Sequence, residues 1–529
     1  MSCDQSYYRH HRLQEALLAV YCLTLVNYAQ GWASFPAHQI TSPIRRCRPI
    51  PENFRNSAAC LPLTEHITSS ERMRHSILPM SSLDEIEDKK VIKKIDSVSP
   101  LSYPLEQLAS ELGGQGRALA VWEYYQNGID PLDHLSDDEG KVKHEIEENM
   151  SVLGKETHRR LARAFLRGDS TSQRNIKQST DSVSLISGAQ LTIRNLVADI
   201  VESKVASDGT VKLLIELQRD GLLVETVIFS LDKKPNDEDC DAQNVETEPN
   251  QSTPLSQSYT VCVSSQVGCR QACTFCRTGR MGIIRSLSAD EILAQAFLAK
   301  AYLRDNMLSR RNNFGGLNAY SLDNLVFMGM GEPADNAQNV IRATQILTDR
   351  NQFAMAPRRI TLSTVAPSVD AVAELAQAPV ILAWSVHSSR NDVRKQLVPT
   401  TKHTMEELRE AFIEALLLRS RQQRALMLEL TLLDGINDST DDAEHLANFC
   451  QPLLNQVPGI KLVVNLIPWN DIEADLGPAR TYQKPSSERV ASFQRSLIDR
   501  GIRCYIRSTR GDDQLAACGQ LATASNKER

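Results

Sequence analysis

The sequence predicts an α/β fold built on a parallel sheet or barrel. From residue 259 onward, apolar strand-like segments alternate with amphipathic helix-like segments, and repeated βα units of this kind form parallel sheets whose active sites lie at the carboxyl ends of the strands. Two helix starts carry capping boxes, Ser288 with Glu291 and Thr404 with Glu407. The expected strands are 324–328, 359–363, 380–386, 426–433 and 461–467.

Two further structured regions precede the alternating half. Residues 98–168 contain three helix-like stretches, LEQLASEL, RALAVWEYYQNG and KETHRRLARAFLRG. Residues 185–232 have strand-like patterns separated by the turn signals SDG and RDG, which predicts a small β extension. The third helix places several of its arginines on one face, and this face either binds phosphates or is simply solvated. These arginines are Arg159, Arg160, Arg163 and Arg167.

Composition excludes several classes of protein. The chain has 529 residues, 41% hydrophobic and 23% charged, with a formal charge of −6, which suits two to four globular units and argues against a disordered or collagen-like chain. The mild acidity argues against a protein whose whole surface binds nucleic acid. No apolar run is long enough to span a membrane.

A polar insert accounts for much of this charge. Residues 233–258 are poor in large apolar groups and are expected to form a disordered insertion. The six acids of this insert alone account for the net charge of −6, so the charges of the remaining residues sum to about zero. These acids are Asp237, Glu238, Asp239, Asp241, Glu246 and Glu248.

The N-terminal region has the character of a targeting sequence. Residues 1–34 combine early basic groups, a short apolar core and small residues, as signal peptides do. Within residues 35–97, the first part, 35–62, is rich in arginine, as organelle transit peptides are. The second part, 63–97, has mixed charge and is expected to be a linker. The tandem arrangement predicts a bipartite presequence and a plastid location. The alternatives for this region are a poorly ordered terminus or a start-site artefact. The alternative locations are the cytoplasm and the mitochondrion.

Three cysteines form a close motif in CVSSQVGCRQACTFC. Cys269, Cys273 and Cys276 have C-x3-C-x2-C spacing, which lets one loop hold a [4Fe–4S] cluster through thiolates. Three ligands leave one iron open to chelate S-adenosylmethionine, and this spacing is the radical-SAM signature. The alternatives are a zinc knuckle or a closed electron-transfer cluster with Cys262 as its fourth ligand.

An ordered set of further motifs gives a family resemblance. From about residue 100 to 522 the chain resembles the RlmN/Cfr family of radical-SAM RNA adenine methyltransferases, and within it the RlmN branch. The motifs that carry this resemblance are CVSSQVGC, CTFC, FMGMGEP, RRITLST, SVH, LLDGINDS, NLIPWN and TRGDDQLAACGQLA. The resemblance implies a partial (β/α) TIM-like radical-SAM barrel over residues 259–500 and a C-terminal segment, 501–529, with a methyl-carrying cysteine.

The resemblance also implies a mechanism. One S-adenosylmethionine methylates Cys518, and a second is cleaved to a radical that activates this methyl group for addition to adenine C2. Glu225 then acts as the proton acceptor, and Cys262 resolves the covalent RNA adduct through a disulfide. The implied contacts to S-adenosylmethionine are Gly331, Glu332, Ser363, Ser385, Val386, His387 and Asn470.

The expected function is C2 methylation of adenosine in large-subunit ribosomal RNA, with transfer RNA as a second substrate. The resemblance implies a monomer that takes electrons from a flavodoxin or ferredoxin and binds RNA through its helical N-terminal domain. It leaves two alternatives open: C8 methylation, as in the Cfr branch, or a catalytically silent iron–sulfur RNA-binding protein. The chain departs from the family pattern in two ways. Several barrel loops contain extra residues, and SVHSSRND stands where alanine and proline usually follow the histidine. Both departures are expected to affect substrate fit more than chemistry.

Overall fold

The fold is described from a computed structural model. It describes residues 99–132, 153–167, 192–230, 257–308, 320–474 and 477–523. The predicted targeting segments and the acids of the predicted insert therefore lie outside the described residues. Within the described ranges, no helix has the length and apolar character needed to cross a membrane.

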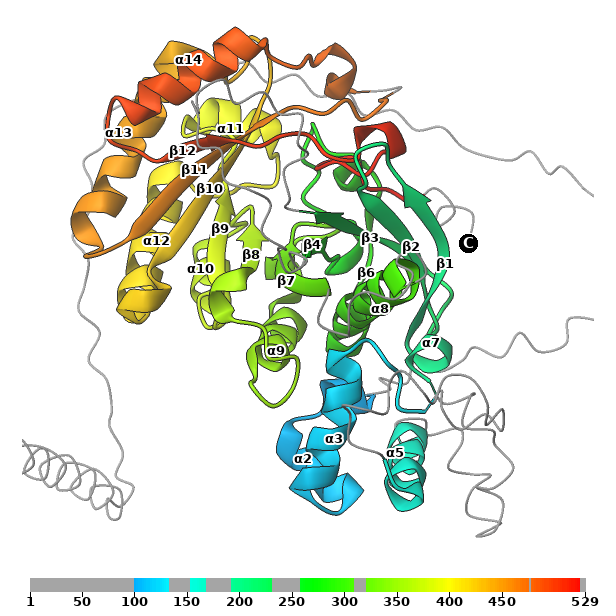
Figure 1. The fold of residues 1–529 in the computed structure, drawn as a ribbon. Coiled ribbons are helices and arrows are strands. Elements are labelled where there is room, and N and C mark those ends of the chain that lie inside the picture. The colour runs from blue at the N-terminus through cyan, green and yellow to red at the C-terminus, as the bar shows by residue number, and fades with distance from the viewer. Residues whose placement is uncertain are drawn as a thin grey trace, which may run out of the picture. The chain divides into compact units, whose positions relative to one another are not determined.

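A ten-stranded sheet forms the centre of the fold (Figure 1), and its strand order is β1-β2-β3-β4-β7-β8-β9-β10-β11-β12. Every neighbouring pair from β4 to β12 is parallel, which confirms the predicted α/β fold with a partial barrel. The parallel strands are β4 (Gln257–Cys262), β7 (Tyr320–Phe327), β8 (Ile360–Thr364), β9 (Ile381–Ser385), β10 (Ala425–Leu432), β11 (Lys461–Pro468) and β12 (Cys504–Ile506).

Helices connect these strands and cover the outer face of the sheet (Figure 1). Both predicted capping boxes form: the Ser288 N–H donates to Glu291 at 2.8 Å and the Glu291 N–H to the Ser288 hydroxyl, and Thr404 and Glu407 are paired in the same way. The helices are α8 (Ala289–Leu308), α9 (Ala337–Thr348), α10 (Val369–Leu375), α11 (Asn391–Leu397), α12 (Met405–Leu418), α13 (Thr440–Gln456) and α14 (Ser487–Ile498).

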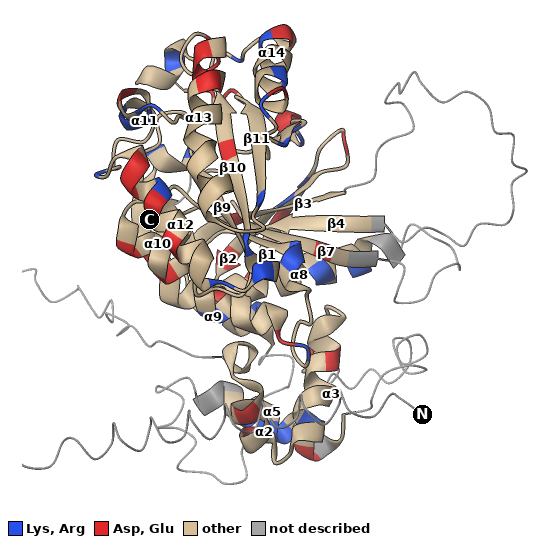
Figure 2. Ribbon diagram, turned by 90° about the vertical axis from the view of Figure 1, so that its left-hand side faces the viewer, with Lys and Arg blue, Asp and Glu red and all other residues tan. Residues whose placement is uncertain are grey.

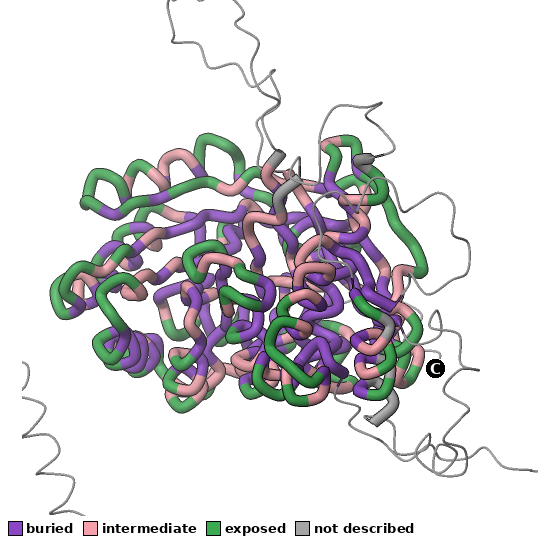
Figure 3. The backbone as a smooth tube through the Cα atoms, turned by 60° about the horizontal axis from the view of Figure 1, so that its bottom comes forward, coloured by how far each residue is buried: buried purple, intermediate pink, exposed green. Residues whose placement is uncertain are grey.

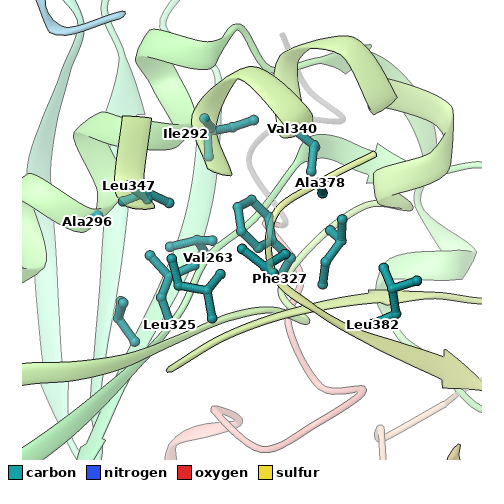
Figure 4. Close-up of a cluster of buried hydrophobic side chains, with 14 of the residues drawn as sticks. Val263, Ile292, Ala296, Leu325, Phe327, Val340, Leu347, Ala378 and Leu382 are labelled. Carbon is teal, nitrogen blue, oxygen red and sulfur yellow. The ribbon is translucent and has the colours of Figure 1, made fainter. Parts of the chain in front are cut away.

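The core lies between this helical layer and the sheet. Figure 4 shows apolar side chains from β7 and β9 meeting others from α8 and α9, with Phe327 and Leu325 near the centre. Further along the sheet, Trp384 of β9 is fully buried and stacks on Phe412 of α12 with ring centroids 4.6 Å apart. Figure 3 shows the strands as mostly buried and the outer turns as exposed.

The β extension joins the barrel through antiparallel pairing. β1 (Ala198–Val205), β2 (Val211–Leu217) and β3 (Leu223–Ser230) form an antiparallel unit, and β3 pairs with β4. The strand-like pattern before β1 is partly wrong as a prediction, because residues Ile193–Leu196 form a short helix, α7. The Thr192 hydroxyl caps this helix by accepting the Asn195 N–H. β4 begins at Gln257, inside the range expected for the insert.

The N-terminal helices lie below the barrel in Figure 1 and share its hydrophobic core, with Trp122 packed on Phe353 and Tyr125 on Phe297. They are α2 (Leu105–Leu112), α3 (Gln115–Gln126) and α5 (Lys155–Arg167). On α5, Arg159 and Arg160 both pair with Glu156, at 2.6 and 2.7 Å. Figure 2 shows acidic and basic residues together on these helices, so part of the cationic character expected from the sequence is neutralised within α5.

We expect Trp384→Ala to destabilise the barrel by about 3–5 kcal/mol, because it removes a fully buried ring and leaves a cavity beside Phe412. The measurement is the free energy of unfolding from urea denaturation. Leu418→Ala is the control, because Leu418 is 91% exposed, and a change at such a surface position stays within about 0.5 kcal/mol. Equal effects of the two substitutions would contradict the packing described.

Candidate functional site

A cavity of about 130 Å³ lies at the carboxyl ends of the parallel strands, and we call it the cysteine cavity. It brings together the three cysteines of the motif and most of the predicted S-adenosylmethionine contacts. Its wall includes Cys269, Cys273, Cys276, Gly331, Glu332, Ser363, Ser385, His387 and Asn470. Val386 is not in this wall. It is buried, and its carbonyl accepts a hydrogen bond from Arg394 at 2.8 Å.

The cysteine loop is held by close backbone packing. Cys269 ends β5 (Gln266–Cys269), which pairs with β6 (Gly282–Ser286). The Cys276 N–H donates to the Cys273 carbonyl at 3.1 Å, which turns the chain sharply between these two cysteines. A Cβ atom at Gly279 would lie 2.9 Å from the Cys273 nitrogen, so the loop can close only with glycine at that position.

The three thiols share a buried environment. Burial raises the pKa of Cys269 to about 12 and also raises the pKa values of Cys273 and Cys276. The neighbouring thiols raise the pKa of Cys273 further. Without a metal these groups are therefore neutral thiols, and metal binding at this loop has to release their protons.

The donor set fits an iron–sulfur cluster. Within the described residues, no three side chains of His, Cys, Asp or Glu are arranged to hold a single metal ion. In a four-iron cube each cysteine binds a different iron, so the thiolates stand further apart than around one ion. Three cysteines that line one cavity, with Cys269 and Cys273 buried and Cys276 partly buried, are consistent with that arrangement.

Aromatic side chains form one side of the cavity. The His387 ring packs on Phe275 with centroids 4.5 Å apart, and its Nδ1 accepts the Thr431 N–H at 3.1 Å. Burial lowers the pKa of His387 well below its usual value, and the Arg394 charge lowers it further. The imidazole is therefore neutral, with Nδ1 as the acceptor. Its backbone has φ of 53°, which turns the chain directly after β9.

The turn after β7 is fixed by contact with β5. Gly331 has φ of 104°, and a Cβ atom there would lie 2.7 Å from the Gln266 nitrogen, so only glycine fits. The Glu332 N–H donates to the Gln266 side chain at 2.9 Å. The Glu332 carboxylate accepts the N–H groups of Ala334 and Val365, both at 2.9 Å. Burial raises the pKa of Glu332 to about 7 although these hydrogen bonds oppose it.

The remaining predicted contacts are hydroxyl and amide groups on neighbouring strands. The hydroxyls of Ser363 and Ser385 lie 3.1 Å apart across β8 and β9. Asn470 follows β11, and its amide donates to the Cys518 carbonyl at 3.2 Å while its oxygen accepts from Thr509 at 2.8 Å. Asn470 therefore connects the cavity wall to the C-terminal segment.

A second cavity of about 350 Å³ adjoins the first, and Cys518 lines both. Cys262 lines the second cavity and not the cysteine cavity, which argues against Cys262 as a fourth cluster ligand. The residues common to both walls are Met328, Ile467, Asn470, Arg507, Cys518 and Leu521.

Both cysteines of this second cavity are free thiols. Burial raises the pKa of Cys262 to about 12, and the Cys518 thiol raises it further. Loss of hydration inside the cavity raises the pKa of the Cys518 thiol to about 11, although the Arg507 charge opposes this shift. The Cys518 thiol therefore acts on the charge of Cys262, and the two cysteines are not joined by a disulfide in this structure.

Glu225 lies on β3 beside this cavity but in neither wall. In the β3–β4 pairing Val227 faces Cys262, and Glu225, two residues earlier, lies on the same side of the strand. Its carboxylate pairs with Lys212 at 3.2 Å and accepts the Ala522 N–H at 2.8 Å. Burial raises the pKa of Glu225, while Lys212 and the Ala522 N–H oppose this shift.

The sequence did not identify Arg394 as part of the site. It is 1% exposed and donates to the carbonyls of Val365 and Ser385 at 2.5 and 2.6 Å, so it holds the turns after β8 and β9 together. Nothing in the sequence separates it from Arg390, which pairs with Asp442 instead.

The ion pair between Arg507 and Glu429 was also missed. The two groups lie 3.3 Å apart, and both line the cysteine cavity. Glu429 is on β10 and Arg507 directly follows β12. β11 lies between these two strands. The signal that could have identified Glu429 is a single acid within an otherwise apolar strand, LMLELTLL.

We expect Cys273→Ala to abolish iron binding. Wild-type protein reconstituted anaerobically with iron and sulfide should carry about four irons per chain, with thiolate-to-iron absorbance, and the variant should lose most of both. Cys450→Ala is the control, because Cys450 is buried in the hydrophobic core beneath the sheet. Full iron content in Cys273→Ala would contradict the cluster assignment.

Comparison with known proteins agrees with this geometry. Residues 263–450 match the Radical SAM superfamily. The dual-specificity RNA methyltransferase RlmN of Campylobacter lari is 36% identical over 335 residues, covering 62% of this chain and 82% of that protein. RlmN of Lawsonia intracellularis is 36% identical over 358 residues, covering 66% and 87%. A radical SAM methyltransferase from Sphaerobacter thermophilus superposes with a TM-score of 0.54 at 28% identity, covering 80% of this chain and 99% of that one. The chain therefore belongs to the RlmN family of radical-SAM methyltransferases.

Proposed function

We propose that this chain methylates C2 of adenosine in large-subunit ribosomal RNA, with transfer RNA as a second substrate. The relatives' name, dual-specificity RNA methyltransferase, supports an RNA substrate. The observation that carries the proposal is the position of Cys518, which lines both the cysteine cavity and the cavity that contains Cys262. One sulfur can therefore face the cofactors on one side and an RNA base on the other.

The cofactors are a [4Fe–4S] cluster and S-adenosylmethionine, which supply a methyl group and a hydrogen-abstracting radical when bound. We propose that two molecules of S-adenosylmethionine serve each turnover, with a flavodoxin or ferredoxin as the electron source. Cys269, Cys273 and Cys276 would hold the cluster. Gly331, Glu332, Ser363, Ser385, His387 and Asn470, which line the cysteine cavity, would bind S-adenosylmethionine.

Each protein group at these positions would have its own role. Gly331 leaves room for a ligand to approach the backbone, and the neutral His387 ring offers a polar edge without a charge. Cys518 would carry the methyl group and form the covalent link to the base, which splits one difficult step into easier ones. The second cavity would receive the adenine after it leaves its stack in the RNA.

Release of the product needs two more groups. Glu225 would accept the C2 proton, and the buried setting that raises its pKa makes it a stronger base than an exposed glutamate. Once the radical adduct has also given up one electron to the flavodoxin or ferredoxin partner, the Cys262 thiolate would attack the Cys518 sulfur. The S–C bond to the base would break, the freed carbon would take a proton from solvent to complete the methyl group, and a disulfide would join the two cysteines. Both thiols line the second cavity, which supports this exchange.

The decisive experiment is mass spectrometry of nucleosides from RNA incubated with reconstituted enzyme, S-adenosylmethionine and a reductant. We expect 2-methyladenosine, and none with Cys518→Ala, because that variant lacks the sulfur that carries the methyl group. Formation of 8-methyladenosine would place the chain with the C8 enzymes. RNA that remains unmodified with the intact, cluster-loaded enzyme would contradict methylation altogether.

We also expect the covalent RNA adduct to accumulate in Cys262→Ala and in Glu225→Gln. In the wild type, adduct release should slow as the pH falls through the raised pKa of Glu225, since the protonated carboxyl accepts no proton. The charged groups that act on this carboxylate are Lys212 on β2 and Arg277 on the cysteine loop. The fraction of RNA crosslinked to protein, measured across pH, tests this. Fast, pH-independent release in Glu225→Gln would contradict the role of Glu225.

A further inference from the structure

The Lys212–Glu225 ion pair contacts the chain on both sides of Cys518. The Lys212 ammonium donates to the Leu515 carbonyl at 3.2 Å, three residues before Cys518. The Glu225 carboxylate accepts the Ala522 N–H at 2.8 Å, four residues after it. The ammonium and the carboxylate are themselves 3.2 Å apart. One buried pair on β2 and β3 therefore holds both ends of the loop that presents the methyl-carrying sulfur.

The loop is shaped to reach this pair. Leu515 has φ of 51°, a left-handed conformation that a residue with a side chain adopts only where its surroundings require it. Gly511 packs so closely on the turn between β1 and β2 that a Cβ atom there would lie 2.9 Å from a Thr210 methyl group. Its N–H donates to Asp208 at 3.1 Å. The segment therefore docks on the β1–β2 hairpin before it turns its Leu515 carbonyl toward Lys212 (Figure 1).

The pair is well placed to control the Glu225 carboxylate. The side chains of Lys212 and Glu225 are only 12% and 7% exposed. Among the interactions found in the described residues, Lys212 is the one cation in direct contact with Glu225, and Arg277 acts only through its more distant charge. Without Lys212 the carboxylate would keep one N–H donor in a buried environment, which favours its protonated form.

We propose that Lys212 is a positioning residue for the step in which Glu225 takes the adenine C2 proton. This inference rests on the proposed function. In that step the C2–H bond breaks, the proton passes to a Glu225 oxygen, and the electron pair stays on the RNA adduct. Lys212 keeps the carboxylate ionised beforehand and holds it at a fixed place relative to the Cys518 loop.

The position of Lys212 makes its effect specific to this step. It is absent from the walls of both cavities, so it touches neither the cofactor site nor the cysteines. The Asn470 amide and the Arg277 N–H hold the carbonyls of Cys518 and Gly519 without Lys212, so methyl loading of Cys518 and formation of the RNA adduct should proceed in its absence. Only proton removal, and the adduct release that follows, should depend on it.

The experiment follows three steps separately in reconstituted full-length enzyme. Peptide mass spectrometry measures S-methylation of Cys518, and gel analysis measures formation and then decay of the RNA adduct. In Lys212→Met we expect methylation and adduct formation near wild-type levels but adduct decay slower by roughly 10- to 100-fold, since misplacing a catalytic group costs about that much. Lys212→Arg should restore most of the decay rate because it keeps the charge.

The matched control is Lys204→Met on β1 of the same hairpin. Lys204 pairs with Glu202 at 3.3 Å with both side chains 49% exposed, so its loss should leave all three steps unchanged. If Lys212→Met does not fold, Lys212→Gln keeps a hydrogen-bond donor without the charge and should show the same selective slowing of adduct decay.

Two results would overturn the proposal. One is equal slowing of all three steps in Lys212→Met or Lys212→Gln, which is the signature of a merely structural role. The other is adduct decay at the wild-type rate. Failure of the proposed function itself would look different, because the wild-type enzyme would then form no methylated Cys518 and no adduct.

Discussion

The site depends on the docking of the C-terminal segment across the open side of the sheet. The sheet does not close, because β1 and β12 are its free edges, and the chain after β12 crosses toward the β extension (Figure 1). From one side the Arg277 N–H donates to the Gly519 carbonyl at 2.7 Å. From the other side Glu225 accepts the Ala522 N–H. Cys518 itself is exposed, so these backbone hydrogen bonds, rather than burial of its side chain, determine where its sulfur lies.

This docking places Cys518 in the wall of both cavities, so the two cavities share one side. The cysteine cavity is formed by strand ends, the cysteine loop and the C-terminal segment, while the second cavity also needs β3 and β4. Both meet at Cys518 and at Arg507, whose charge is balanced by Glu429. A buried charge without a partner is costly, so this pair lets a cation lie between the two cavities. It also places a positive group near both thiols, which favours their anionic forms.

The sequence predicted the parts of the site that are local in the chain. The cysteine motif spans eight residues, and its spacing alone indicated a cluster loop; the strand ends that carry Ser363 and Ser385 followed from periodicity. Contacts between distant residues had no such signal: Lys212 meets Leu515 across 303 positions. Arg394 was missed because its partners are backbone carbonyls, which leave no trace in composition. The prediction of a strand before β1 was wrong because the Thr192 hydroxyl caps a helical turn there.

The distances along the chain also bear on how the site assembles. The three cysteines of the motif lie within one short loop, so their part of the cysteine cavity can form once β4 to β11 are in place. The second cavity requires β3 and the segment after β12 together, and Glu225 is 297 positions from Ala522. Contacts of such long range form late, because chain closure costs entropy before the contact repays it. We therefore expect the segment that contains Cys518 to dock after the barrel strands have paired. Its docking combines hydrogen bonds to the backbone with apolar packing, because the side chains of Ala516 and Leu521 belong to the main hydrophobic core. The same long-range contacts that fix the backbone on both sides of Cys518 therefore also complete the core on the open side of the sheet.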